Sequence, residues 1–172
     1  IKGAMGRDNA LALEMNPLVG DVIPLFQALK NVGLDTLMLP LDCATTEAQQ
    51  IHVPGKASLL SDTYWKNVRA AVPLFGAGNV TSNIIVGLEP LADTLRVLQQ
   101  MIDEGVVGEA IPVRWDDSKS FPAADRPLTR PEDMLAVRRF IRSRTAPTAC
   151  GTHFAPTKAG CAACGGCGGV AH

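Results

Sequence analysis

The sequence lacks a strong excess of charge and has no long apolar run. Its 172 residues carry 16 Lys and Arg against 17 Asp and Glu, a formal net charge of -1, so the composition does not favour a nucleic-acid or membrane surface. No apolar stretch reaches the roughly 18 residues that a transmembrane helix needs, and no basic segment with a following apolar one opens the chain. We therefore expect a soluble, cytoplasmic protein with no nucleic-acid or membrane partner.

Cysteine is scarce and unevenly placed. Of the five cysteines, Cys43 stands alone, while Cys150, Cys161, Cys164 and Cys167 lie close to the end of the sequence. An odd number with this clustering is not typical of a secreted disulfide framework, and it favours a metal site in a reducing compartment. We expect Cys43 to be a small buried filler.

Strand-like and helix-like stretches alternate through most of the chain. Short apolar stretches typical of strands occupy residues 10–15, 36–41, 79–86 and 110–114. Each is followed by a segment whose apolar residues recur every three or four positions, at about 18–32, 62–75, 90–104 and 131–142. This order, repeated four times, predicts an α/β fold with parallel strands and right-handed crossovers.

Four strand–helix units do not close a barrel, because an eight-unit TIM barrel typically takes about 250 residues. The sequence therefore predicts half of a TIM-type β/α barrel, and a six-unit barrel lacking its first strands or a small open sheet are the alternatives. Because the sequence opens at Ile1 and its first strand would leave an exposed edge, we expect the back part of a longer product. We divide it into a partial barrel, residues 1–145, and a Cys- and Gly-rich tail, residues 146–172.

One connection, residues 44–61, is polar and too long for a simple turn. We expect it to be functional or to contain a short helix. His52 and Lys56 lie in this connection, and a solvated loop is the preferred interpretation for both of them over a place in a binding site.

The third strand ends in a pattern that often accompanies a ligand. The apolar run from Ile84 to Val86 breaks at Gly87, and Glu89-Pro90 then opens an amphipathic segment. At the carboxyl end of a parallel strand, a glycine lets a ligand approach the backbone because no Cβ stands in the way. The same turn is also the ordinary joint of any α/β protein, so the pattern alone does not establish a site.

Three segments in the same order resemble the radical S-adenosylmethionine superfamily, and within it proteins related to biotin synthase. Leu41-Asp42-Cys43 resembles the asparagine–leucine–aspartate–threonine strand end of that group. Residues 82–94 resemble its glycine-rich strand and following helix, and residues 127–139 resemble its loop and final helix. The resemblance covers roughly residues 10–145 and implies the C-terminal part of such a barrel.

The resemblance implies an activity and its partners. Such enzymes bind a four-iron four-sulfur (4Fe-4S) cluster through a Cys-x-x-x-Cys-x-x-Cys loop, cleave S-adenosylmethionine reductively to a 5'-deoxyadenosyl radical, and abstract hydrogen from a small-molecule substrate. Flavodoxin or ferredoxin donates the electron. No cysteine trio in this sequence has that spacing, so the catalytic loop would lie in a missing N-terminal part, and we expect this fragment alone to be inactive.

The resemblance also implies which residues bind S-adenosylmethionine. Asp42 matches the strand-end acid that contacts the nucleoside or the amino-acid part, and a carboxylate can accept from ribose hydroxyls or an ammonium. Ile85, Val86 and Gly87 match the strand that packs on the adenine. Glu89 lies one position closer to the glycine than in the family form. A turn role for Asp42 and a helix-capping role for Glu89 are the alternatives.

Polar residues at the ends of two other strands are candidate substrate contacts. Glu14 and Asn16 end the first strand, with turn formation as the alternative. Arg114 ends the fourth strand, where an arginine can hold a substrate carboxylate with two hydrogen bonds.

The cysteine tail is a separate pattern. Cys161, Cys164 and Cys167 recur every third residue, Cys150 lies upstream, and the Gly-rich segment between and after them can wrap an ion without steric conflict. The tail predicts an auxiliary iron–sulfur cluster, with zinc or no metal as alternatives. His153 and His172 could each replace one thiolate.

Two other functions compete with the radical enzyme. One is a non-catalytic iron–sulfur or zinc scaffold protein that binds through the tail. The other is an aldolase-like barrel enzyme with Lys56 as its Schiff-base amine, which would require that lysine to be buried at a strand end.

Overall fold

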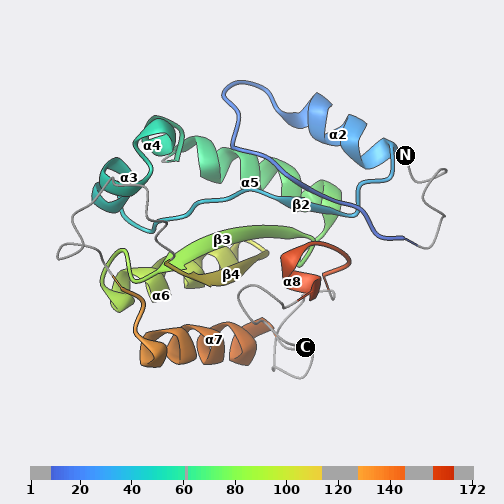
Figure 1. The fold of residues 1–172 in the computed structure, drawn as a ribbon. Coiled ribbons are helices and arrows are strands. Elements are labelled where there is room, and N and C mark those ends of the chain that lie inside the picture. Colours follow the sequence, from blue (N-terminus) through green and yellow to red (C-terminus); the bar gives the residue numbers. More distant parts are fainter. Residues whose placement is uncertain (1–8, 61, 114–127, 146–156, 165–172) are drawn as a thin grey trace.

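The computed structural model describes residues 9–60, 62–113, 128–145 and 157–164, with only the backbone described at residues 58–60, 161 and 164. Four strands form one parallel sheet in the order β1-β2-β3-β4 (Figure 1). They are β1 (Ala12–Glu14), β2 (Thr36–Met38), β3 (Val80–Val86) and β4 (Val106–Pro112). The predicted α/β fold with parallel strands is confirmed at this level.

The helices follow the strands in the predicted alternation. The described helices are α2 (Ile23–Asn31), α3 (Thr46–His52), α4 (Pro54–Leu60), α5 (Asp62–Phe75), α6 (Leu91–Asp103), α7 (Pro131–Thr145) and α8 (Cys161–Cys164). The long connection between β2 and α5 contains α3 and α4, so the expected short helix is present. No helix in the described ranges combines the length and the apolar character that crossing a membrane requires.

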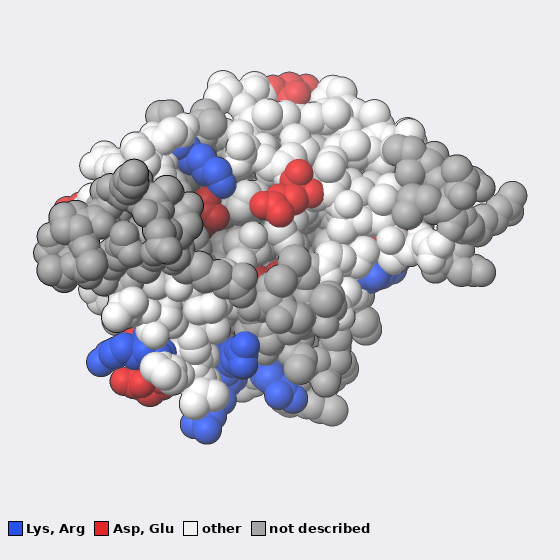
Figure 2. All heavy atoms as spheres, in the orientation of Figure 1, with Lys and Arg blue, Asp and Glu red and all other residues white. Residues whose placement is uncertain are grey.

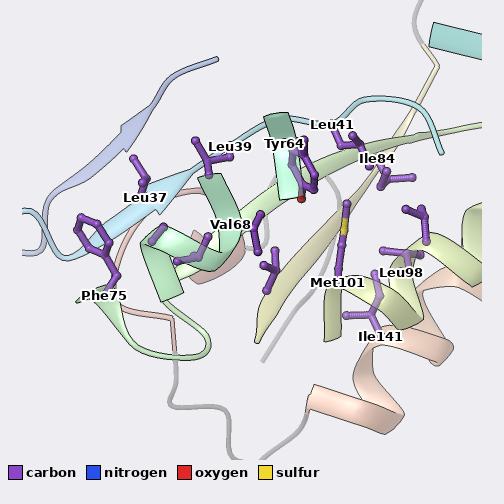
Figure 3. Close-up of a cluster of buried hydrophobic side chains, with 14 of the residues drawn as sticks. Leu37, Leu39, Leu41, Tyr64, Val68, Phe75, Ile84, Leu98, Met101 and Ile141 are labelled. Carbon is purple, nitrogen blue, oxygen red and sulfur yellow. The ribbon is translucent and has the colours of Figure 1, made fainter. Parts of the chain in front are cut away.

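One face of the sheet carries the hydrophobic core. Side chains alternate between the two faces of a strand, and Leu37, Leu39, Val80, Ile84 and Val86 all pack on the face that α5 and α6 cover. Figure 3 shows Leu37, Leu39, Leu41 and Ile84 beside side chains from the helices. The helix residues in this contact are Tyr64, Val68 and Phe75 of α5, Leu98 and Met101 of α6, and Ile141 of α7.

A glycine in β4 sets how closely α6 approaches the sheet. A Cβ added to Gly108 would lie 2.3 Å from Cδ2 of Leu98, closer than two carbon atoms can approach. The Leu98 side chain is fully buried and therefore occupies the space that any larger residue at position 108 would need.

Two strand boundaries differ from the prediction by three residues or more. β2 is a regular strand only to Met38, because Pro40 has no N–H to donate to a neighbouring strand. β4 begins at Val106 instead of Ala110. Gly108 and Glu109 interrupt the apolar pattern there, although both residues pair with β3.

Candidate functional site

The face of the sheet opposite α5 and α6 is lined by both polar and apolar residues, and we call it the inner face. Its residues alternate with those of the core, and the strand register places neighbours side by side, as Met38 with Thr81 and Asn83 with Glu109. The inner face comprises Ala12, Glu14, Thr36, Met38, Thr81, Asn83, Ile85, Val107, Glu109 and Ile111. Figure 2 shows acidic side chains standing apart from one another in the middle of the molecule, one of them beside a Lys or Arg.

Part of the tail covers the amino end of the inner face. Thr157 Oγ1 donates to the Gly78 carbonyl (2.7 Å), Lys158 N donates to Asn79 Oδ1 (3.2 Å), and Ala159 N donates to Thr36 Oγ1 (3.2 Å). We call residues 157–162 the floor segment. The floor segment therefore docks at the beginning of the strands, at the end of the sheet opposite to Asp42 and Gly87.

The floor segment also contacts both outer strands. A Cβ added to Gly160 would lie 3.3 Å from Cβ of Ala12 in β1. The backbone of Ala162 hydrogen-bonds to the carboxylate of Glu109 in β4. The floor segment therefore contacts β1, β2 and β4 directly and the turn that precedes β3.

Asp42 lies at the carboxyl end of the sheet in an unusual conformation. Its φ of 67° is the only positive φ among the non-glycine residues that the structure describes. The backbone is held on both sides, because Asp42 N donates to the Asn83 carbonyl (2.9 Å) and Ile85 N donates to the Asp42 carbonyl (2.8 Å). Left-handed backbone is unfavourable for a residue with a Cβ, and such conformations concentrate at functional sites.

The carboxylate of Asp42 is paired with Lys56. Lys56 Nζ lies 2.7 Å from Asp42 Oδ2, with 29% of the lysine side chain and 12% of the aspartate side chain exposed. The expectation that Lys56 lies on a solvated loop is wrong. Pro54 begins helix α4, a position that proline favours because its missing N–H is not needed there, and the helix directs Lys56 to the end of β2.

Glu89 holds the chain that leads into α3. Its Oε1 accepts from Ala44 N (2.6 Å), and its Oε2 accepts from Thr45 N (2.9 Å). Thr45 in turn caps α3 by accepting from Ala48 N. Hydrogen bonds from N–H groups to a charged carboxylate are among the stronger ones in proteins, so in this structure Glu89 stabilises the turn between β2 and α3.

Cys43 lies buried beside these charges. Burial, and secondarily the negative charges of Glu89 and Asp42, raise the pKa of its thiol to about 12. A thiol with this pKa stays protonated at neutral pH and is a poor nucleophile and metal ligand. The expected buried filler role is consistent with this environment.

The space beside Gly87 is filled by the chain itself. Gly87 has a φ of 107°, and an added Cβ would lie 2.9 Å from Cα and 3.0 Å from N of Thr129. Thr129 Oγ1 donates to the Val86 carbonyl and accepts from Val113 N at 2.7 Å. Gly87 thus permits close approach of the segment before α7. Through Thr129, this segment links the ends of β3 and β4.

The residues predicted to bind S-adenosylmethionine are therefore in different environments. Asp42 offers a carboxylate at the strand end, and Ile85 presents a half-buried apolar side chain on the inner face. A carboxylate and an apolar side chain are the types of group that the resemblance implies for such a ligand. The Val86 side chain is in the helix-side core, Gly87 contacts Thr129, and Glu89 serves the turn before α3. Only Asp42 and Ile85 present side chains that such a ligand could reach.

Of the predicted substrate residues, Glu14 lies on the inner face and Asn16 is exposed just after β1. Arg114, Cys150 and Cys167 lie outside the described residues. Cys161 and Cys164 are in α8, but their side chains are also outside the description. In the described part of the chain, no group of three or more His, Cys, Asp or Glu is arranged to hold a metal ion.

Three inner-face residues were not among the sequence-predicted candidates: Thr81, Asn83 and Glu109. Glu109 is 2% exposed. Burial raises the pKa of its carboxyl to about 7, with a smaller contribution of the same sign from Glu14 and an opposing one from the hydrogen bond to Ala162. Asn83 and Glu109 each interrupt a mostly apolar strand sequence. This feature of the sequence could have indicated both residues as candidates.

Comparison with known proteins adds no further assignment: neither the scan against family models nor the search of curated proteins gave a match.

Proposed function

We propose that residues 1–145 form the C-terminal part of the β/α barrel of a radical S-adenosylmethionine enzyme. Two features of the fold support the proposal. The strands are parallel, and strands that are neighbours in the sheet are also consecutive in the chain, as in a barrel. In most open α/β sheets, by contrast, the order of the strands reverses at a switch point. In addition, α5 and α6 pack on one face and leave an inner face with polar side chains.

The carboxyl ends of β2 and β3 form one side of the cofactor site in this proposal, and the conformation of Asp42 is the observation that carries it. A residue held at a φ of 67° by two backbone hydrogen bonds projects its carboxylate from a fixed position. The Asp42 carboxylate would accept from ribose hydroxyls or the ammonium of S-adenosylmethionine, and Ile85 would pack against the adenine.

When bound together with a 4Fe-4S cluster, S-adenosylmethionine supplies a radical for hydrogen abstraction from a small substrate. The residues of this chain bind and orient the cofactor, and Ile85 limits the access of water to it. The cluster-binding loop would come from the part of the enzyme that precedes this sequence, and flavodoxin or ferredoxin would supply the electron.

The proposal extends to the tail, where Cys150, Cys161, Cys164 and Cys167 would hold an auxiliary iron–sulfur cluster or zinc. The docking of residues 157–162 supports a fixed position for such a group beside the sheet. Anaerobic reconstitution followed by iron, sulfide and zinc analysis tests this part, and Cys161→Ala should lower the metal content. Unchanged metal content in that variant would contradict the assignment.

The nucleoside site can be tested without the missing part of the enzyme. We expect S-adenosylhomocysteine, which is not cleaved, to shift the amide NMR signals of Asp42 and Ile85 in the 172-residue chain with weak affinity. Asp42→Asn should lower this affinity about tenfold, because it removes a charged hydrogen-bond acceptor. Asp21→Asn is the matched control, since Asp21 is exposed and accepts from Ile23 N, two residues away.

The proposed site is wrong if millimolar S-adenosylhomocysteine leaves the signals of Asp42 and Ile85 in place. It is also wrong if Asp42→Asn and Asp21→Asn bind the compound equally well.

A further inference from the structure

Three buried polar atoms gather on the inner face without a partner. Thr81 Oγ1, Asn83 Oδ1 and Glu109 Oε1 are all inaccessible to solvent, and none has a hydrogen bond within the described residues. Each such atom costs about 1 to 3 kcal/mol compared with a hydrogen-bonded state. Buried polar atoms in proteins almost always have a partner, so three neighbouring exceptions point to a missing one.

The strand register brings these atoms together. Asn83 and Glu109 are direct partners across β3 and β4, where neighbouring strands lie about 4.8 Å apart. Thr81 lies two positions before Asn83, on the same face of β3. The three residues are therefore neighbours on the inner face.

The charged side chains of this cluster are the carboxylates of Glu14 and Glu109. Glu14 on β1 acts electrostatically on Glu109 across the inner face. The Glu109 carboxylate also accepts a hydrogen bond from the backbone of Ala162 in the floor segment. No Lys or Arg ion pair with Glu14 or Glu109 is found in the described ranges, and Lys56, on α4, is paired with Asp42.

We propose that Thr81, Asn83 and Glu109, with Glu14 nearby, bind the ammonium group of a small-molecule amine. An ammonium carries three N–H donors and one positive charge, which match three oxygen acceptors and a carboxylate. Asn83 is half-buried and Glu14 is exposed, so the amine enters the cluster past these two side chains. The inference rests on the proposed function only in taking this amine to be the substrate of that enzyme.

A pair of probes of equal size separates charge recognition from simple burial. In NMR titrations of the 172-residue chain at pH 8 and constant ionic strength, n-butylammonium should shift the amide signals of Asn83 and Glu109. The neutral n-butanol should not shift them. Glu109→Gln should weaken butylammonium binding at least tenfold, and Glu14→Gln should weaken it by two- to fivefold.

Two further variants guard against misinterpretation. Glu47→Gln removes an exposed carboxylate from α3 and should bind butylammonium like the wild type. Thr81→Val keeps the shape and removes one acceptor, so it should also weaken binding even if Glu109→Gln fails to fold.

The inference is overturned if butanol shifts the same signals as butylammonium, or if neither probe shifts them, in which case the three atoms hold water only. Equal binding by Glu109→Gln, Thr81→Val and the wild type also overturns it. If S-adenosylhomocysteine shifts Asp42 and Ile85 while butylammonium shifts nothing, the amine site fails and the proposed function stands. If butylammonium shifts Asn83 and Glu109 while S-adenosylhomocysteine shifts nothing, the amine site is supported and the proposed enzyme function is wrong.

Discussion

The two faces of the sheet differ in the way their side chains are satisfied. On the helix side, Leu37, Ile84 and Val106 are fully buried among other apolar side chains. On the inner face, Thr81 and Glu109 are equally buried but have side-chain oxygen atoms without partners. Tyr64 Oη and Thr94 Oγ1, on α5 and α6, also lack a partner, but every unpartnered buried side-chain oxygen of the described strands lies on the inner face. The two faces of the sheet therefore differ in the hydrogen-bonding state of their strand residues, although both faces bury side chains.

This difference separates stability from binding. Close-packed apolar contacts lower the free energy of the folded state wherever they occur. Unpartnered acceptors and a left-handed Asp42 raise it, and proteins retain such features mainly at functional sites. The helix side should then respond to substitution through stability, and the inner face through ligand binding and pH.

The largest effect is expected on the helix side. Leu98→Ala should lower the free energy of unfolding by about 2 to 5 kcal/mol, because it leaves a cavity between α6 and Gly108 of β4. Leu135→Ala on α7 is the control, since Leu135 is 50% exposed, and it should change the value by about 0.5 kcal/mol or less. Chemical denaturation measures both. Similar losses for the two variants would contradict the assignment of the core to this face.

A smaller effect is expected at the carboxyl end of β3, where Gly87 contacts the segment before α7. Gly87→Ala should destabilise the protein by roughly 2 to 4 kcal/mol, because alanine is unfavourable at a φ of 107° and its Cβ would contact the Thr129 backbone. In the helical control Gly55→Ala, the new Cβ meets no atom within 4 Å, so we expect a small gain in stability. A Gly87→Ala variant as stable as the wild type would show that Thr129 does not pack there.

The smallest effect depends on pH and comes from the inner face. The pKa of Glu109 is raised from 4.5 to about 7, so the folded state binds this proton more tightly than the unfolded state. Its contribution to stability is complete below pH 4.5 and is lost as the pH rises through 7. Between pH 5 and pH 8, the wild type should lose on the order of 2 kcal/mol more stability than Glu109→Gln.

Denaturation curves at several pH values test this difference, and Glu47→Gln should keep the pH dependence of the wild type. Parallel pH profiles for the wild type and Glu109→Gln would contradict the raised pKa and the burial of an unpartnered oxygen.

Much of the fold could be predicted from local sequence. Apolar periodicity located α5 and α6, and Gly105 correctly marked the end of α6. The prediction started α2 too early, because Pro24 fixes the first turn of the observed helix at Ile23. Periodicity also could not place Lys56, since Pro54-Gly55 is typical of a turn as well as of the beginning of a helix.

The site was less predictable, because its geometry depends on contacts between distant segments. The position of Asp42 at a strand end is visible in the sequence, but its pairing with Lys56 depends on the course of α3 and α4. Thr129 fills the space at Gly87 from 42 positions further along the chain. Glu109 and Asn83 are neighbours only once β3 and β4 are in register, which no local pattern specifies.

The floor segment has a consequence for the order of folding. Its hydrogen bond from Ala159 to Thr36 joins residues 123 positions apart in the chain, and such distant contacts form slowly because a long loop must close first. The segment has nothing to dock on until the strands have assembled. The amino end of the inner face is therefore expected to close last during folding and to exchange its amide hydrogens with solvent sooner than the centre of β3.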